Sequence, residues 1–240
     1  MPLTLAFPKP LTSVDVVIFS ARAGLLQVLL VQRPIDADDP FPGLWALPGG
    51  FVDTGKDQDL ESCAKRKLKE KTGVEASYLE QLGSWGSVSR DPRGWSATHV
   101  YFALMSADDV ELQPGGNARD SRWFAIDGQR AKEKLAFDHA EILKAAIARL
   151  RGKVEYTSLP AFLMPHEFTL TELQKIYETL LGRPIEKKSF RTRILAIDLL
   201  EEVARRKEGA NRPAQMYRLR SRRHPLFFTR ALVAGVVSRK

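Results

Sequence analysis

The stretch LPGGFVDTGKDQDLESCAKRKLKEKTGV, residues 47–74, joins a glycine turn to a helix and decides the fold of the first half of the chain. The Pro-Gly-Gly at 48–50 predicts a loop or turn, because these residues interrupt regular structure. From Asp57 to Thr72 the apolar residues recur at helical spacing, and Gly73 follows as a stop signal. We therefore expect a turn that leads into one amphipathic helix.

This stretch resembles the Nudix box, in which glycine is followed by five residues, Glu, seven residues and Arg-Glu-hydrophobic-x-Glu-Glu-x-Gly-hydrophobic. The matching residues are Gly50, Arg66, Leu68, Glu70, Gly73 and Val74, after the usual entry Leu47-Pro48-Gly49. The resemblance implies a Nudix fold, a mixed sheet sandwiched by helices. Residues 1–152 are the expected Nudix-like effector-binding domain.

The box departs from the family pattern where an active enzyme would hold magnesium. Carboxylates at i, i+3 and i+4 would converge on Mg²⁺, but these places are Lys67, Glu70 and Lys71. Lys56 replaces the first glutamate, and the spacer before Arg66 is nine residues long. One ammonium group ~4 Å away repels a divalent ion by on the order of 8 kcal/mol at an effective dielectric near ~20. We expect no catalytic residue, no bound metal and no enzyme activity.

Two other functions remain open from the sequence. An active Nudix hydrolase of ADP-ribose or a related dinucleotide would need Asp53, Asp57, Asp59 or Glu61 to take the metal instead. A nucleotide-binding adaptor that ignores DNA would leave the order of elements in the second half unexplained.

A pocket that does not cleave can still bind a pyrophosphate, because Arg66 with Lys67 or Lys71 would neutralise it. Aromatic faces suit a base, and arginines in a turn suit ribose or phosphate. Against these roles, most aromatic side chains belong to the core, and a charged turn is often only surface. The candidate effector-binding residues are Arg33, Phe41, Trp45, Gly49, Gly50, Arg66, Lys67, Glu70, Lys71, Arg90, Arg93, Phe102 and His139.

The rest of the first half alternates strands with helices, which indicates an α+β domain. Two β-branched runs, 14–20 and 25–31, flank Arg22-Ala23-Gly24 and predict a hairpin. Further strands are expected at 78–85, 98–105 and 121–126, and an amphipathic helix at 138–150. Residues 152–166 contain two prolines and no sustained period, so we expect a linker there.

Residues 153–240 follow the order of a winged helix-turn-helix domain. A helix is expected after the N-cap candidates Thr169 and Thr171, with its apolar residues at helical spacing up to Leu180. The elements expected after it are a turn at 182–184, a helix at 188–197, an extended run at 199–207, a turn at 209–213 and an extended run at 215–220.

The net charge of +8 is divided very unevenly along the chain. Residues 1–150 carry 18 basic and 20 acidic side chains, whereas residues 151–240 carry 19 basic and 9 acidic ones. This asymmetry favours a polyanion as the partner of the second half, although a solvated basic surface would give the same count.

The second helix of a helix-turn-helix motif lies in the major groove of double-stranded DNA. The candidate DNA-binding residues are Thr171, Lys187, Lys188, Ser189, Arg191, Thr192, Arg193, Arg205, Arg212 and Arg218.

The whole chain is similar to the Nudix-related transcriptional regulators of NAD metabolism. The resemblance rests on the box and on four further stretches, Phe168–Gln174, Arg212–Leu219, Arg90–Trp95 and Phe137–His139. It implies a homodimeric repressor of NAD biosynthesis or salvage genes that binds a palindromic operator and is released by ADP-ribose. No cofactor is required in this reading, since ADP-ribose acts as the effector.

Cysteine content and the first residues bear on the compartment. Cys63 is the single cysteine, so no internal disulfide can form. Residues 1–10 lack the charged and apolar regions of an export signal, and the longest apolar runs fall short of the ~20 residues that span a bilayer. We expect a cytoplasmic protein without a membrane role.

Overall fold

A computed structural model describes residues 9–22, 24–36, 38–73, 75–106, 108, 110, 112, 119–207, 213–221 and 224–228. Val74 of the box and Arg212, a DNA-binding candidate, lie outside these residues. The side chain of Arg205 also lies outside the description, although its backbone belongs to a strand.

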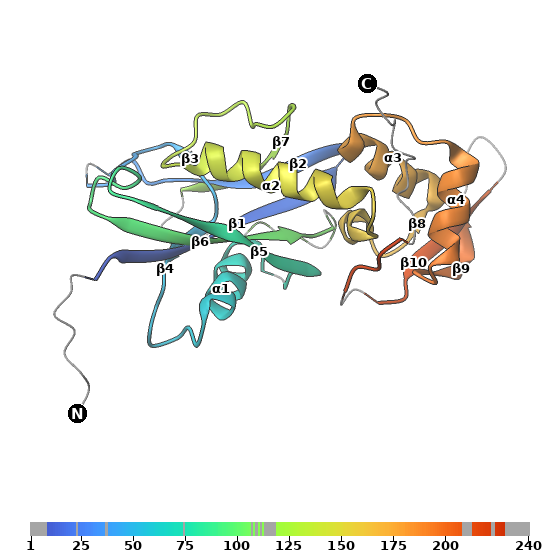
Figure 1. Cartoon of the computed structure of the whole chain (residues 1–240), viewed down its shortest axis with the longest axis horizontal. Helices are drawn as coiled ribbons and strands as arrows, with labels where there is room; N and C mark the ends of the chain where they lie inside the picture. Colours follow the sequence, from blue (N-terminus) through green and yellow to red (C-terminus); the bar gives the residue numbers. More distant parts are fainter. Residues whose placement is uncertain are drawn as a thin grey trace, which may run out of the picture.

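The first half is a mixed seven-stranded sheet with a helix on each face (Figure 1). Its strands are β1 (Leu11–Arg22), β2 (Leu25–Gln32), β3 (Trp45–Ala46), β4 (Gly49–Phe51), β5 (Tyr78–Ser87), β6 (Ser96–Leu104) and β7 (Asp120–Ala125). The strand order is β3-β2-β1-β6-β5, with β4 paired to β1 and β7 to β2. The pairing of β1 with β6 is parallel, and the other pairings in this sheet are antiparallel.

Alternating side chains of β1 supply both hydrophobic cores of this half. Val17 and Phe19 pack into the core beneath α2 (His139–Val154). Val16 and Ile18 face the opposite way, into the core beneath α1 (Leu60–Thr72). This alternation arises because successive side chains of a strand point to opposite faces. The expected sandwich of helices around a mixed sheet is confirmed.

The helix of the box begins later than its apolar period predicts. Asp59 has extended backbone and forms a capping box with Ser62, so α1 starts at Leu60 instead of Asp57. Gly73 ends the helix in the left-handed conformation, with φ of 72°, as expected of its position after the last apolar residue.

The second half contains two helices and a three-stranded sheet of order β8-β10-β9. Its elements are β8 (Phe168–Thr169), α3 (Leu170–Leu181), α4 (Lys187–Ala196), β9 (Leu200–Lys207) and β10 (Ala214–Leu219). Thr169 caps α3 by accepting a hydrogen bond from the Glu172 N–H at 3.2 Å, while the Glu172 side chain accepts from the Thr169 N–H at 2.8 Å. The order matches the expected winged helix-turn-helix, apart from the turn at 209–213, most of which lies outside the described residues.

Much of the segment expected to be a linker is packed into the core. Helix α2 continues to Val154, past the boundary placed at residue 152, and a 3₁₀ helix, η2 (Leu159–Leu163), follows with every residue buried. Its side chains join the core beneath α2, which continues into α3 and α4 through residues such as Leu173 and Phe190. Pro160, one of the two prolines that suggested a linker, therefore lies in a short buried helix that joins the two halves, and Pro165 follows that helix.

Candidate functional site

A cavity of about 810 Å³ opens beside the box and collects most of the expected effector-binding residues. Its walls come from β1, β4, α1, the start of α2, the loop after β2 and the turn between β5 and β6. The lining residues that the sequence pointed to are Arg33, Gly49, Gly50, Arg66, Lys67, Glu70, Lys71, Arg90, Arg93 and His139. The fold thus gathers side chains that are up to about a hundred residues apart in the sequence.

A buried carboxylate, Asp15, organises the floor of the cavity. It accepts a hydrogen bond from the Thr98 hydroxyl at 2.7 Å, and His139 Nε2 lies 3.5 Å from the same oxygen. The Nδ1 atom of His139 accepts the Leu47 N–H at 2.9 Å, so a neutral His139 carries its proton on Nε2, facing Asp15. Burial raises the pKa of Asp15, but His139, Thr98 and Arg90 outweigh it and hold that pKa below its usual value. Asp15 is therefore an anion inside the protein.

Gly49 allows β4 to lie against this carboxylate. A Cβ atom at Gly49 would stand 2.0 Å from Asp15 Oδ1 and 2.6 Å from the carbonyl oxygen of Val14. Neighbouring Gly50 has φ of 150°, a conformation that side chains rarely adopt, and Lys67 Nζ approaches it from α1. Close packing of β4 against β1 therefore requires glycine at position 49, and the positive φ favours glycine at position 50.

Three arginines of the cavity are each held by an aspartate through two hydrogen bonds. Arg33 binds Asp39 at 2.8 and 2.6 Å, Arg90 binds Asp138 at 2.9 Å twice, and Arg93 binds Asp91 at 3.0 and 2.7 Å. Such forked pairs fix the direction of a guanidinium group. Asp138, the N-cap residue of α2, makes no side-chain cap hydrogen bond and orients Arg90 instead.

Lys67 and Lys71 of the box helix face the same cavity. Arg66 binds Asp57 at 2.7 and 2.6 Å and Glu70 at 2.8 Å, while Lys67 Nζ stands 3.8 Å from Glu70. The Arg66 guanidinium holds the pKa of Asp57 far below its usual range. Burial lowers the pKa of Lys71. The acidic partner of Arg66 is thus Asp57, one residue after Lys56. Counting residues by the Nudix pattern did not identify it, because the spacer before Arg66 has a different length in this chain.

The carboxylates that a metal would need have other partners. Asp57 is bound to Arg66, Asp59 caps α1, Asp53 lies 3.0 Å from Lys56, and Glu61 lies 2.6 Å from Lys65. Within the part of the chain that the structure describes, no group of three or more His, Cys, Asp or Glu side chains could hold a metal ion. The geometry of the cavity suits an anion better than a divalent cation.

The three aromatic candidates lie outside the lining of the cavity. Phe102 is fully buried beneath α2, Trp45 packs edge-on against Phe124, and Phe41 packs against Phe137. The aromatic residues that do line the cavity are Phe51 and Phe137. Phe137 has positive φ, 53°, and Arg33 stacks on its ring at 4.8 Å. Neither of these two phenylalanines lies in a regular apolar pattern, so sequence reasoning had only a weak signal for them.

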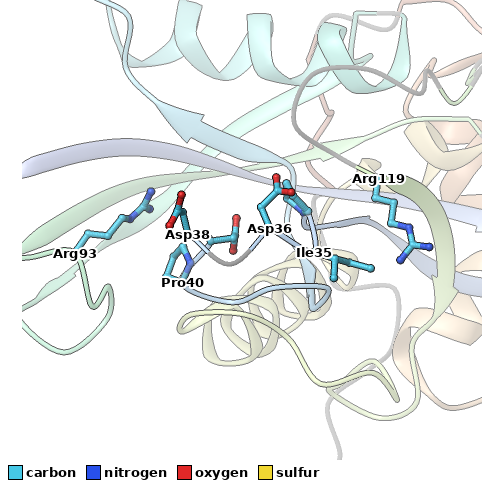
Figure 2. A pocket seen from close by; sticks show the side chains of 8 residues that line it. Ile35, Asp36, Asp38, Pro40, Arg93 and Arg119 are labelled. Atoms are coloured by element: carbon cyan, nitrogen blue, oxygen red, sulfur yellow. The ribbon is translucent and has the colours of Figure 1, made fainter.

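A second cavity of about 730 Å³ lies on the other side of the loop after β2. Figure 2 shows Arg93 and Arg119 on either side of the acidic residues Asp36 and Asp38 of this loop. Pro34, Asp39 and Arg93 contribute to both cavities. The loop therefore forms a shared wall between them.

Only some of the candidate DNA-binding residues on helix α4 (Lys187–Ala196) are exposed to solvent. Lys187, Lys188 and Thr192 are exposed, and Ser189 is partly buried. Arg191 and Arg193 are half-buried, with Arg191 Nε and Arg193 Nη1 enclosed by protein. Thr171 is exposed in the first turn of α3, and Arg218 is exposed on β10, where it pairs with Glu201.

Two family models match the chain. Residues 9–146 match the NUDIX domain, and residues 160–219 match the NrtR DNA-binding winged helix domain. Among the described residues, no helix combines the length and apolar character needed to cross a bilayer.

Curated relatives include a regulator and an enzyme. The ADPR responsive transcriptional repressor NtrR of Acinetobacter baylyi is 48% identical over 226 residues, which are 94% of this chain and 88% of that protein. The ADP-ribose pyrophosphatase of Methanocaldococcus jannaschii is 37% identical over 120 residues, 49% of this chain and 64% of that protein. The similarity to the enzyme thus covers only about half of this chain.

Solved structures of Shewanella oneidensis NrtR are similar over both halves. The protein alone is 42% identical with a TM-score of 0.82, covering 92% of this chain and 99% of that one. Its complex with a 27mer DNA is 40% identical with the same TM-score and the same coverage. The NUDIX domain of that protein complexed with ADP ribose is 44% identical with a TM-score of 0.54, covering 60% of this chain and 91% of that one.

Proposed function

Because the chain belongs to the NrtR family, in which a Nudix domain precedes a DNA-binding winged helix, we propose that it is a transcriptional repressor whose DNA binding is relieved by ADP-ribose. It acts as a cytoplasmic homodimer on a palindromic operator of NAD biosynthesis or salvage genes. A dimer with two-fold symmetry requires an operator of matching symmetry. Residues 1–152 form the effector-binding domain and residues 153–240 the DNA-binding domain, with α2 and η2 at the junction; the family matches at residues 9–146 and 160–219 support this division.

The effector occupies the cavity beside the box, with its diphosphate near Lys67 and Lys71. The observation that carries this assignment is that lysines stand where magnesium-binding glutamates would stand, so cations of the protein replace the metal. Arg33, Arg90 and Arg93 are already oriented by aspartates, and an oriented guanidinium loses less entropy when it binds phosphate or ribose. The stacked ring of Phe137 provides an apolar wall.

The same residues make this a binding site and not a catalytic site. Attack of water on a diphosphate requires a metal ion or an equivalent base, and the nearby carboxylates are bound to Arg66, Lys56, Lys65 and the first turn of α1. No cofactor is needed, because ADP-ribose itself carries the signal.

Titration of DNA binding with ADP-ribose tests the function directly. The full chain should bind a duplex from the promoter region of NAD genes, and ADP-ribose without added metal should release it. If DNA contacts involve about six to ten phosphates, affinity should fall by ~10³–10⁵ between 50 and 200 mM salt. Binding that is flat across this range, or insensitive to ADP-ribose, would contradict the proposal.

A charge-reversed variant tests the position of the diphosphate. Lys67→Glu/Lys71→Glu should lose ADP-ribose binding in calorimetry without metal, while Lys65→Glu, on the exposed side of α1, should bind as the wild type does. The double variant places two carboxylates beside that of Glu70, three in all, so it should also gain affinity for Mn²⁺. Unchanged ADP-ribose affinity would remove the lysines from the site, and rapid hydrolysis of ADP-ribose by the wild-type protein would identify a hydrolase instead.

A further inference from the structure

The outward face of α4 carries an apolar side chain in the middle of a basic region. Leu195 is 49% exposed, one of few large apolar side chains so exposed among the described residues, and it lies in the helix that a winged helix-turn-helix places in the major groove. A lone exposed leucine needs no explanation on an ordinary surface. On a helix that faces DNA, however, an apolar side chain meets the edges of the bases.

Helical geometry assigns Leu195 to the side opposite the core. Phe190 and Ile194 are fully buried and define the inner face of α4. Lys188, Thr192 and Leu195 follow at i, i+4 and i+7, so they form one outward stripe. Thr192 and Lys188 are exposed in agreement with this position.

The other candidate groups of α4 are less available to read bases. The Glu186 side chain accepts hydrogen bonds from the N–H groups of Lys188 and Ser189 at 2.9 and 2.6 Å, so the amino end of the helix already holds a carboxylate. Arg191 and Arg193 lie on the flanks of the stripe, each with a guanidinium nitrogen enclosed by protein. Thr192 in the middle of α4 and Leu195 in its last turn therefore remain available on the outward face.

We propose that Thr192 and Leu195 select thymine by packing against its 5-methyl group in the major groove. This inference rests on the proposed DNA binding of the chain. The methyl of thymine is the apolar feature that a base pair presents in the major groove, and threonine methyls and other apolar side chains are suited to contact it. The flanking Lys187 and Lys188 supply the charge complementarity that holds a duplex against this face.

The expected discrimination follows from the loss of one buried methyl group. Replacing a contacted thymine by deoxyuridine leaves the base pairing unchanged and removes only that methyl, which should weaken binding about fourfold. A palindromic operator read by two chains should show about 15-fold weakening when both symmetry-related thymines are replaced.

The test begins with duplexes that the full wild-type chain selects from a randomised library. Each thymine of the selected site is replaced by deoxyuridine in turn, and binding is measured by fluorescence anisotropy at fixed salt. Wild-type protein should lose about fourfold at one thymine per half-site. Leu195→Ala should bind the thymine duplex more weakly and should distinguish the thymine and deoxyuridine duplexes less than the wild type does, because only Thr192 still contacts the methyl group. Leu195→Met should remain sensitive to the replacement.

Leu25→Ala is the matched control, because Leu25 is 51% exposed and lies on β2 in the other half of the chain. It should behave as the wild type does on both duplexes. The inference is overturned if no thymine of the selected site responds to replacement, or if Leu195→Ala stays as sensitive as the wild type. It is also overturned if Leu195→Ala changes the oligomeric state in size-exclusion chromatography and leaves the discrimination between the two duplexes unchanged. Failure of the wild type to select any duplex would instead refute the proposed DNA binding.

Discussion

Replacing Gly49 with alanine should test how tightly the cavity floor is packed. The added Cβ would lie 2.0 Å from Asp15 Oδ1, 2.6 Å from the Val14 carbonyl oxygen and 2.9 Å from Asp15 Cγ. Two of these atoms belong to a buried carboxylate and one to the backbone, so no flexible side-chain end can simply turn away. Strand β4 or the Asp15 side chain has to move.

The cost can be worked out from the contacts that would be lost. Overpacking of a filled interior costs about 1–3 kcal/mol. Displacing Asp15 also weakens its hydrogen bond with Thr98, 2.7 Å long, which contributes about 1 kcal/mol. We therefore expect Gly49→Ala to lower the free energy of unfolding by about 2–4 kcal/mol. For a chain of this length that loss corresponds to a fall in Tm of about 5–15 °C.

Gly152→Ala is the control for this substitution. Gly152 lies in α2, has no heavy atom within 4 Å of its would-be Cβ, and has helical surroundings. Alanine there should raise the free energy of unfolding by about 0.5–1 kcal/mol. Denaturant unfolding gives the free energy of unfolding of both variants, and calorimetry gives their affinity for ADP-ribose. A Gly49→Ala variant as stable as the wild type, with unchanged affinity, would refute the packing argument.

Three further outcomes are expected. Thr169→Ala should lower the free energy of unfolding by about 1 kcal/mol in denaturant titration, because it removes the acceptor that caps α3; an unchanged midpoint would show that water replaces the cap. The pKa of Asp15 is lower in the folded chain than in the unfolded chain, so the ionised carboxylate stabilises the fold fully above pH ~3.9 and this contribution is lost as the pH falls further. Asp15→Asn should therefore make the free energy of unfolding fall less steeply at acid pH. Because burial lowers the pKa of Lys71 and a diphosphate beside it would raise it, ADP-ribose binding in alkaline buffer should take up protons, measurable by calorimetry in buffers of different ionisation enthalpy; Lys71→Met should abolish the uptake.

Elements with a regular apolar period could be predicted closely from the sequence. The hairpin of β1 and β2, the box helix and α3 all appear within a few residues of their expected bounds. Their signals are local, because strand alternation, helical spacing and the stop at Gly73 act within a few neighbouring residues. The box also predicted which residues of α1 face the cavity, since Arg66, Lys67 and Lys71 all line it.

Features that depend on distant partners could not be predicted in this way. Phe102 and Phe137 have the same side chain, yet Phe102 is buried in a central strand and Phe137 lies in a bend at the cavity wall. Asp57 faces Arg66 because the loop before α1 turns back, which residue counting from Gly50 does not reveal. Pro160 and Pro165 indicated a linker, but η2 within that segment is buried against α3 and the end of α2, whose sequences give no sign of that contact.

The packed junction constrains how ADP-ribose can release DNA. In one chain the Tyr177 hydroxyl donates to the Thr157 carbonyl at 3.0 Å, the Thr179 hydroxyl donates to the Gly24 carbonyl at 2.8 Å, and both halves share one hydrophobic core. Separating the halves would expose buried side chains such as Tyr177, at a cost of about 1.5–3 kcal/mol each. A ligand shifts an equilibrium only by its difference in affinity for the two states, and such coupling is usually about 1–3 kcal/mol. In the proposed homodimer, the cheaper change is a rotation between the two chains, each moving as one body. Distances between spin labels on Lys175 and Glu141 of one chain should therefore stay constant when ADP-ribose binds, while the distance between the two copies of Lys175 changes; a change within one chain alone would contradict this argument.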